Sequence, residues 1–496
     1  MKFLGAVLSL WLSTVVNGDK VIVASASGVS YLGVRNSTGN QDVFFRIPYA
    51  KPSVGALRFK PAQTWAPESN NSIADVTVEG PTCIQGAPIT YSPVSEDCLH
   101  LNLYGGGFLN GKIIGYPGEG LVRTAFQLEK PVIYVAMNYR LGIYGFPPGT
   151  QSEVAGALNL GLKDQRLALE WVKENIASFE RDPERVMIFG ESAGDMSVAY
   201  QMMYKDGNHG GIFRTALMES GAPSTHAALR ASYPARQASY DFIANATGCA
   251  SDNFECLRHA NTDTPREANY NSFKLPPGLK SPDPYPSAVG PTLSSGDSFL
   301  TRPPKETIRR GNFTRIPFVC GTSLDEGTMF TTNPATTEDV VFFLAIQLPA
   351  HTFGVINETT AKRLLEYYPE DPSAGSPYNT GNDTFGRATQ YKRAASVLGD
   401  LLFEAPRRDF VQVANKLGVP ACRSYQWALT GLRLPEFGAS HGFELGLIFF
   451  KEYPERATQS FIGLSAAMID YWVTLAYKLD PGAPTDPNCE LLSLEI

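Results

Sequence analysis

The segment Gly190–Gly194 constrains this chain more than any other, because it carries the pattern Gly-x-Ser-x-Gly directly after a strand-like run. That run, Arg185–Phe189, is apolar in its last four residues, and a helix-like segment follows the pattern. A serine on such a sharp strand-to-helix turn projects its hydroxyl out of the sheet, where it can act as a nucleophile. The flanking glycines are needed because the turn strains the backbone and leaves no room for side chains. The pattern therefore predicts a nucleophilic serine at Ser192.

A second match to the pattern, Gly438–Gly442, competes with the first. It follows a loop-like stretch, Leu434–Phe437, rather than a strand. Proteins built on this turn carry the serine, the acid and the histidine in that order along the chain. No histidine follows His441 that could serve Ser440. The order therefore favours Ser192.

Three short, continuously apolar runs are typical of strands buried on both faces of a parallel sheet. These runs are Pro131–Met137, Arg185–Phe189 and Arg315–Cys320. Between the first two, apolar residues recur at helical spacing from Leu162 to Phe179. Strand, helix and strand in that order form a parallel crossover unit, so we expect an α/β fold. Residues 222–305 are rich in Pro, Ser and Asn, which predicts an insertion of loops over the sheet.

The overall composition bounds the class of protein and its partners. The chain has 496 residues, of which 43% are hydrophobic and 18% charged, so it can bury a large core and is not of the disordered class. The net charge of -7 and the isoelectric point near 5.6 provide no attraction to nucleic acid or to an anionic membrane. No low-complexity linker divides the sequence. We therefore expect residues 19–496 to form a single domain.

The N-terminal segment is typical of a secretory signal peptide. Lys2 precedes an apolar run, Phe3–Val16, and small residues follow where a signal peptidase would cut. The run is shorter than the roughly 20 apolar residues that a membrane span requires. We therefore expect removal of residues 1–18, secretion, and no stable membrane anchor. Six glycosylation sequons fit a secreted surface: Asn36, Asn70, Asn245, Asn312, Asn357 and Asn382.

Seven cysteines in a secreted chain predict disulfide bonds. Two pairs bracket short loops and predict two local bridges, namely Cys83 with Cys98 and Cys249 with Cys256. Cys320 ends an apolar run, so we expect a small buried hydrophobic residue there. Cys422 and Cys489 remain without an assigned partner. No Cys-x-x-Cys motif or histidine cluster accompanies these residues, so we expect no metal site and no cofactor.

A nucleophilic serine needs a base that removes its proton and a carboxylate that orients the base. Among the later histidines, His441 is the best candidate base, because it lies in a loop of small residues ahead of an apolar run. His351 follows a proline in a run that can equally be a packed segment. The sequence therefore predicts that His441 serves Ser192.

The acid and the oxyanion donors are expected at the ends of other strands. Asp325 and Glu326 both follow the predicted strand 315–320, at the edge where active sites of open sheets collect. Position alone leaves these two carboxylates in competition. The amide of Ala193, next after the serine, and amides of the triplet Gly105–Gly107 are the candidate donors for an oxyanion.

Several segments spread over residues 20–480 carry motifs of one family. They are Phe45–Ala50, Ser95–Leu99, Asn138–Gly142, Asp164–Leu169, Gly190–Gly194, Glu219–Gly221 and His441–Leu445. Together these segments resemble the type-B carboxylesterase/lipase family, which also includes the cholinesterases. The resemblance implies the α/β-hydrolase fold, in which helices flank a mostly parallel central sheet, with large loop and helical insertions.

The resemblance also implies roles for individual residues. It makes Glu326, rather than Asp325, the carboxylate of the triad. The oxyanion donors that it implies are the amides of Gly106, Gly107 and Ala193. Glu191 and Ser220 match positions that support the histidine. Two local disulfides of the family correspond to Cys83–Cys98 and Cys249–Cys256.

Two features depart from the family pattern. In the family, a polar loop and a second apolar strand precede the glycine loop, whereas here Leu103 runs directly into Tyr104 and Gly105. One strand of the sheet is missing, so either Leu101–Tyr104 holds the oxyanion loop or the loop is displaced. Asp195 stands where the family usually has Gly or Ala. Its charge is tolerable near a helix start, but its side chain is expected to crowd the packing.

These observations predict a secreted serine carboxylic ester hydrolase that acts through Ser192, His441 and Glu326 and forms an acyl-enzyme. The expected substrate is a small-molecule or lipid ester, and no nucleic acid partner is expected. The alternative is a catalytically impaired or non-catalytic member of the family, because of the segment that is missing before the glycine loop. The presence of Ser192 favours the enzyme.

Overall fold

A computed structural model describes most of the chain. The described residues are 19–25, 28–37, 40–67, 72–80, 83, 100–101, 103–226, 228–272, 289–347, 356–430, 434–449 and 459–482. The predicted signal peptide, Cys98 and Cys489 lie outside the described residues.

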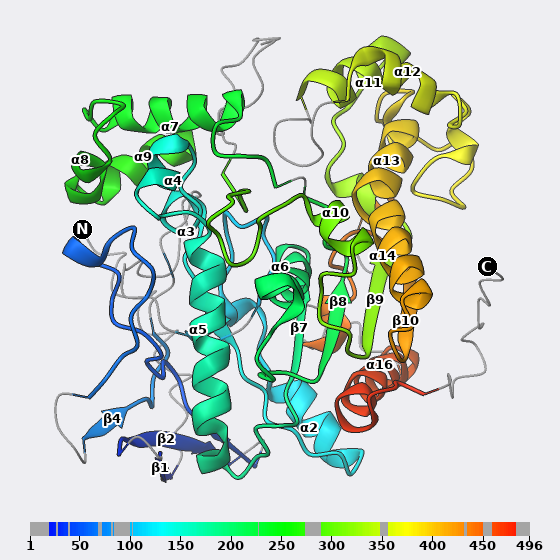
Figure 1. Cartoon of the computed structure of the whole chain (residues 1–496). Helices are drawn as coiled ribbons and strands as arrows, with labels where there is room; N and C mark the ends of the chain where they lie inside the picture. The colour runs from blue at the N-terminus through cyan, green and yellow to red at the C-terminus, as the bar shows by residue number, and fades with distance from the viewer. Residues whose placement is uncertain are drawn as a thin grey trace, which may run out of the picture.

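A parallel four-stranded sheet forms the centre of the molecule (Figure 1). Its order is β10-β9-β8-β7. The strands are β7 (Met187–Glu191), β8 (Thr215–Glu219), β9 (Phe318–Ser323) and β10 (Cys422–Trp427). The predicted strands at 185–189 and 315–320 are therefore confirmed as β7 and β9, each displaced by a few residues towards the C-terminus.

The strands are buried on both faces because successive side chains of a strand point to opposite sides. In β8, Ala216 and Met218 pack into the core on one face, whereas Leu217 packs into the core on the other. In β9, Phe318 packs into the core on the first face and Val319 into the core on the second. Two apolar layers thus enclose the sheet, which is why these segments are continuously apolar in sequence.

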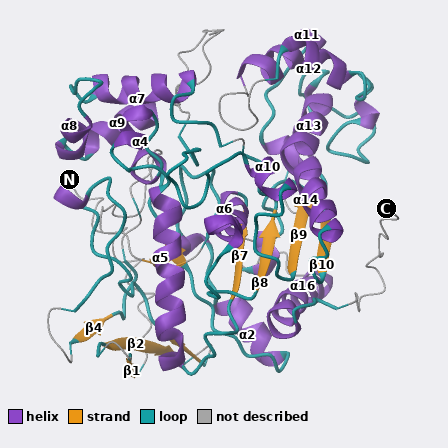
Figure 2. Cartoon of the chain, viewed as in Figure 1, coloured by secondary structure: helices purple, strands orange, loops and turns teal. Residues whose placement is uncertain are grey.

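Helices cover both faces of the sheet (Figures 1 and 2). The first face is covered by α5 (Leu160–Asn175), α6 (Ala193–Met203) and α14 (Ala405–Lys416). The second is covered by α2 (Glu119–Gln127) and α16 (Gln459–Lys478). This arrangement of helix, sheet and helix is the expected α/β architecture.

Two groups of helices lie beyond one end of the sheet (Figure 1). One group is α7 (Pro234–Ala246), α8 (Phe254–His259) and α9 (Asp263–Ser272). The other, α11 (Thr337–Phe342), α12 (Glu358–Leu365) and α13 (Tyr391–Gly399), has its own apolar core. The prediction of loops throughout 222–305 is wrong for the first group. Pro234 suits the first turn of α7, and apolar residues such as Tyr240 and Ile243 form its buried face.

Shorter elements complete the fold. The N-terminal strands form a separate sheet: β1 (Lys20–Ala24), β2 (Ser30–Asn36), β3 (Gln41–Val43) and β4 (Ile73–Asp75). The remaining short helices are α3 (Gly142–Gly145), α4 (Thr150–Val154), α10 (Pro304–Arg309) and α15 (Leu445–Ile448). Within the described parts of the chain, no helix has both the length and the apolar character needed to cross a bilayer.

The predicted strand Pro131–Met137 is the main error of the sequence analysis. Only its last residue is in a strand, the two-residue β6 (Met137–Asn138), which pairs antiparallel with β5 (His100–Leu101). The rest of the run has the apolar composition of a buried strand but pairs with no strand among the described residues. A strand forms only where a partner satisfies its backbone groups, and composition alone does not reveal the partner's absence.

The cysteines agree in part with the prediction. Cys249 and Cys256 form a disulfide with an S–S distance of 2.06 Å. Cys320 is buried, as expected from its apolar run, and Cys422 is also buried and forms no disulfide with a described cysteine. The pairing of Cys83 with Cys98 stays a prediction, because Cys98 is outside the described residues.

Candidate active site

Ser192 occupies the turn between β7 and α6. Its backbone angles, φ 58° and ψ -122°, lie in a region that residues with side chains rarely adopt. The turn needs small neighbours, since a Cβ atom on Gly194 would lie 2.0 Å from the carbonyl oxygen of Leu103. The geometry is that of the strained serine turn expected from the sequence.

His441 and Glu326 lie next to this serine. His441 Nε2 is 2.8 Å from Ser192 Oγ, and His441 Nδ1 is 2.6 Å from Glu326 Oε2. The backbone N–H of Ser323, at the end of β9, donates to Glu326 Oε1 at 2.7 Å. Glu326 is 1% exposed, so this carboxylate is held against the imidazole away from solvent. Three residues from distant parts of the sequence thus form one continuous hydrogen-bonded chain.

Asp325, the competing carboxylate, faces another direction. Its Oδ1 accepts hydrogen bonds from the Ser376 hydroxyl at 2.7 Å and from the Tyr378 N–H at 2.9 Å. Its Oδ2 accepts a hydrogen bond from the N–H of Ala439 at 2.9 Å. Asp325 therefore binds the loop that carries His441, whereas its neighbour Glu326 contacts the imidazole itself.

Two aromatic rings flank the imidazole, and sequence reasoning missed both. The ring centroids of Phe330 and Phe403 lie 4.9 and 4.8 Å from that of His441. Phe330 follows the Asp325-Glu326 turn by four residues and is 40% exposed. The rings restrict the orientation of His441 and place an apolar surface beside the serine. No local pattern distinguishes them from ordinary packed aromatic residues.

Burial and the neighbouring carboxylates shift the pKa of the His441 imidazole in opposite directions. Burial lowers the pKa of His441, but the negative charges of Glu326 and Glu191 outweigh it and raise that pKa to about 9. Glu191 Oε1 is 3.2 Å from His441 Nε2. Burial in turn raises the pKa of the Glu191 carboxyl to about 7. The site therefore stabilises a positively charged imidazole, the species formed when histidine takes a proton from serine.

Glu444 belongs to the same buried region, although the sequence analysis gave it no role. Its two carboxyl oxygens accept hydrogen bonds from Ser220 Oγ at 3.3 Å and Ser323 Oγ at 3.4 Å. Burial raises the pKa of Glu444 to about 8. The position of Glu444 three residues after His441 in the family motif was the available signal. Ser220 therefore hydrogen-bonds to Glu444 rather than to the imidazole, whereas Glu191 contacts the imidazole of His441 directly.

The glycine triplet lies beside the serine. A Cβ atom on Gly105 would be 2.9 Å from Ser192 Cβ, which shows how closely the backbone passes the nucleophile. Gly106 has a φ of 96°, a conformation that favours glycine. A bridge between Leu103 and Gly190 ties the triplet to the end of β7. Of the two alternatives for the missing strand, the structure supports the one in which the segment before the triplet holds the loop next to the turn.

Asp195 lies in the first turn of α6 and is completely buried. Among the described residues, neither carboxyl oxygen accepts a hydrogen bond of normal geometry. A Cβ atom on Gly221 would be 2.8 Å from Asp195 Cγ, so the expected crowding is present. Burial, then the charges of Glu191 and Glu326, hold the pKa of Asp195 well above its ordinary value.

No cluster of three or more His, Cys, Asp or Glu side chains in the described part of the chain is arranged to hold a metal ion. The hydrogen bond between Ser192 Oγ and His441 Nε2 allows a proton to pass between these two side chains. Such a site, on a parallel sheet covered by helices, is typical of the α/β-hydrolase class.

Comparison with known proteins identifies the family. A model of the carboxylesterase family matches residues 27–490, so this chain belongs to that family. The crystal structure of Aspergillus niger EstA superimposes with a TM-score of 0.79 and 25% identity, covering 95% of this chain and 91% of that one. The fold is therefore the α/β-hydrolase fold, as the sequence predicted.

Characterised relatives carry names that refer to lipases. The secreted triacylglycerol lipase LIP1 of Gibberella zeae is 34% identical, over 93% of this chain and 82% of the relative. Lipase 2 of Geotrichum candidum is 30% identical, over 95% and 88%. Lipase 4 of Diutina rugosa is 34% identical, over 82% and 79%. The prediction of a carboxylesterase/lipase relationship is confirmed.

Proposed function

We propose that this protein is a secreted serine carboxylic ester hydrolase. The general activity, hydrolysis of carboxylic esters, is supported by its family and by the lipases among its relatives. The specific part of the proposal assigns Ser192 as nucleophile, His441 as general base and acid, and Glu326 as the carboxylate that orients the histidine. The observation that carries it is the pair of hydrogen bonds at 2.8 and 2.6 Å that joins these three side chains.

The proposed reaction has two stages. His441 Nε2 takes the proton from Ser192 as Oγ attacks the ester carbonyl, and the backbone amides of Gly106, Gly107 and Ala193 stabilise the resulting oxyanion. Collapse of this intermediate releases the alcohol, which receives the proton from His441. Water then attacks the acyl-enzyme by the same route and releases the acid. Glu326 stabilises the imidazolium through its hydrogen bond to Nδ1.

We propose fatty acyl esters as the substrate class. The ring of Phe330, which is 40% exposed and lies beside His441, provides an apolar surface for an acyl chain, and the buried ring of Phe403 packs against both. The name of the G. zeae relative, a secreted triacylglycerol lipase, points to the same class and to export from the cell. Removal of residues 1–18 and a single domain over 19–496 are part of this proposal.

Fluorophosphonate labelling tests the nucleophile. We expect covalent modification of Ser192, mapped by mass spectrometry, together with hydrolysis of p-nitrophenyl esters and of a dispersed triacylglycerol. Ser192→Ala should abolish labelling and reduce turnover to the residual level of about 10³–10⁴ over water that triad enzymes retain. The matched control is Ser440→Ala, which changes the serine of the second Gly-x-Ser-x-Gly pattern and should leave labelling of Ser192 intact. Modification of Ser440 in the wild type would contradict the assignment.

A further inference from the structure

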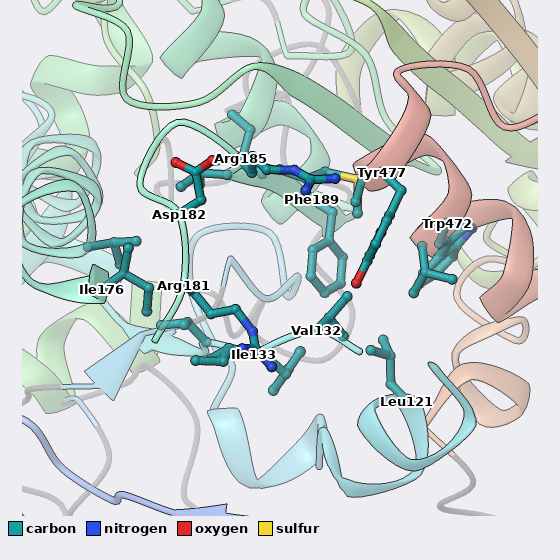
Figure 3. Close-up of a pocket in the computed structure, with 18 of the residues that line it drawn as sticks. Leu121, Val132, Ile133, Ile176, Arg181, Asp182, Arg185, Phe189, Trp472 and Tyr477 are labelled. Carbon is teal, nitrogen blue, oxygen red and sulfur yellow. The ribbon is translucent and has the colours of Figure 1, made fainter. Parts of the chain in front are cut away.

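A mainly apolar cavity of about 450 Å³ lies on the side of β7 that β8 does not occupy, and the charged residues Arg181, Asp182 and Arg185 line part of it (Figure 3). We call it the sheet slot. Residues 131–135 form its outer wall and β7 its inner wall. Leu121 of α2 and Trp472 of α16 close one face, and Ile176, next after α5, lies on the other. The slot therefore has sheet-like walls at its sides and helical cover above and below.

Each side wall of the slot includes backbone groups that pair with no backbone group of the described residues. β8 pairs with one edge of β7, and on the other edge a single bridge, between Leu103 and Gly190, joins β7 to another described residue. In the opposite wall, the backbone groups of residues 132–135 make no backbone hydrogen bond to any described residue. Ile133 is 37% exposed, although its sequence context is that of a buried strand. One wall is thus the free edge of strand β7, and the other is a non-strand segment whose backbone groups at 132–135 pair with no described backbone group.

The sequence accounts for this space. The family pattern includes an apolar strand before the glycine loop, and here Leu103 leads directly into Tyr104 and Gly105. The sheet slot lies next to β7, where the family pattern has this additional strand and the present chain does not.

The chemistry of the walls determines what fits. An acyl chain or another purely apolar ligand would fill the slot but leave the backbone N–H and C=O groups unsatisfied, at a cost of about 1–3 kcal/mol for each buried group. An extended peptide provides donors and acceptors along both of its edges while its side chains pack against the helices. A strand buried on both faces is apolar throughout. We propose that the sheet slot binds an extended apolar peptide segment of another polypeptide, which adds a strand between β7 and residues 131–136.

The test uses a designed peptide as the probe. Its core is five residues long, the length of β7, and consists of valine, isoleucine and tyrosine. Glutamates at both ends of the peptide keep it soluble. Fluorescence anisotropy of the labelled peptide measures binding to the full chain. Hydrogen exchange measured by mass spectrometry locates it, and we expect slower exchange in residues 131–136 and 186–190.

Two controls separate strand addition from simple apolar contact. A peptide with the same side chains but N-methyl groups at alternate residues lacks donors along one edge and should bind about tenfold more weakly. Ala476→Trp fills the slot from α16 and should weaken binding of the unmodified peptide by at least about tenfold. The matched variant Ala467→Trp, on the same helix but outside the slot, should leave binding unchanged. Cooperative thermal unfolding confirms that both variants fold.

Three results would overturn the proposal. Equal affinity for the two peptides would mean that backbone hydrogen bonds do not hold the strand. Protection located outside the two walls would place the peptide elsewhere on the molecule. Binding of the fluorescent fatty acid cis-parinarate that is lost in Ala476→Trp, without any peptide binding, would make the slot an acyl site. None of these outcomes depends on ester hydrolysis, so the proposal that the slot binds a peptide is tested independently of the proposed function.

Discussion

Asp195→Asn tests how the buried carboxyl under the serine turn affects stability. The folded state holds the pKa of Asp195 well above the ordinary value of 3.8, because the carboxyl is buried beside other carboxyls. Above that ordinary pKa, the folded protein keeps a proton that the unfolded chain releases. Stability therefore falls as pH rises from about 3.8 towards the raised pKa, by about 1.4 kcal/mol for each pH unit. Asparagine has nearly the same shape and no such equilibrium.

The expected change in the free energy of unfolding with pH is large enough to measure. Between pH 5 and pH 7 the wild type should lose stability relative to Asp195→Asn, by up to about 1.4 kcal/mol for each pH unit in which only the folded carboxyl keeps its proton, against the roughly 5–15 kcal/mol that is typical of folded proteins. Glu191 and Glu444, whose pKa values are also raised, contribute the same trend to both proteins. Asp195 contributes to the raised pKa of Glu219, so the difference between the two proteins reports position 195 together with its effect on Glu219. Urea unfolding followed by circular dichroism at pH 5, 6 and 7 provides the free energies.

The control is Asp252→Asn, which changes an exposed aspartate in a distant turn and should show no pH-dependent difference from the wild type. A difference between wild type and Asp195→Asn that stays constant from pH 5 to pH 7 would refute the reasoning. It would mean that Asp195 is ionised in the folded state and has a partner that compensates its burial.

Four further predictions concern the site and the disulfide. Glu326→Gln should reduce kcat/KM by about 10⁴, as loss of the orienting carboxylate does in triad enzymes, while Ser192 stays in place. Because His441 must be neutral to act as a base and its pKa is raised to about 9, kcat/KM should rise with pH through that region. Glu191→Gln removes a negative charge 3.2 Å from Nε2 and should shift the rise to lower pH; an unchanged pH profile would contradict this. Replacing Cys249 and Cys256 with serine should cost about 2–4 kcal/mol in urea unfolding, without changing the pH profile.

Much of the fold could be predicted because strands buried on both faces are unusually easy to recognise. The runs that became β7 and β9 are short, apolar and followed by turn residues, and the helical spacing that became α5 precedes the first of them. The same reasoning failed at residues 131–136, since a strand also needs a neighbour. It failed again at α7–α9, where Pro and Ser suggested loops although tertiary packing stabilises helices.

The sequence by itself determined the candidate nucleophile, because the serine turn is a local structure whose glycines are required by backbone sterics within five residues. It also ordered the candidates for base and acid along the chain. Position along the chain left Asp325 and Glu326 in competition, and only the family resemblance chose Glu326. The tertiary structure shows that Glu326 contacts the imidazole, and it alone decided that Phe330 and Phe403 lie against that ring. Consecutive residues in a turn point in different directions, and which direction meets His441 depends on how strands far apart in the sequence are packed.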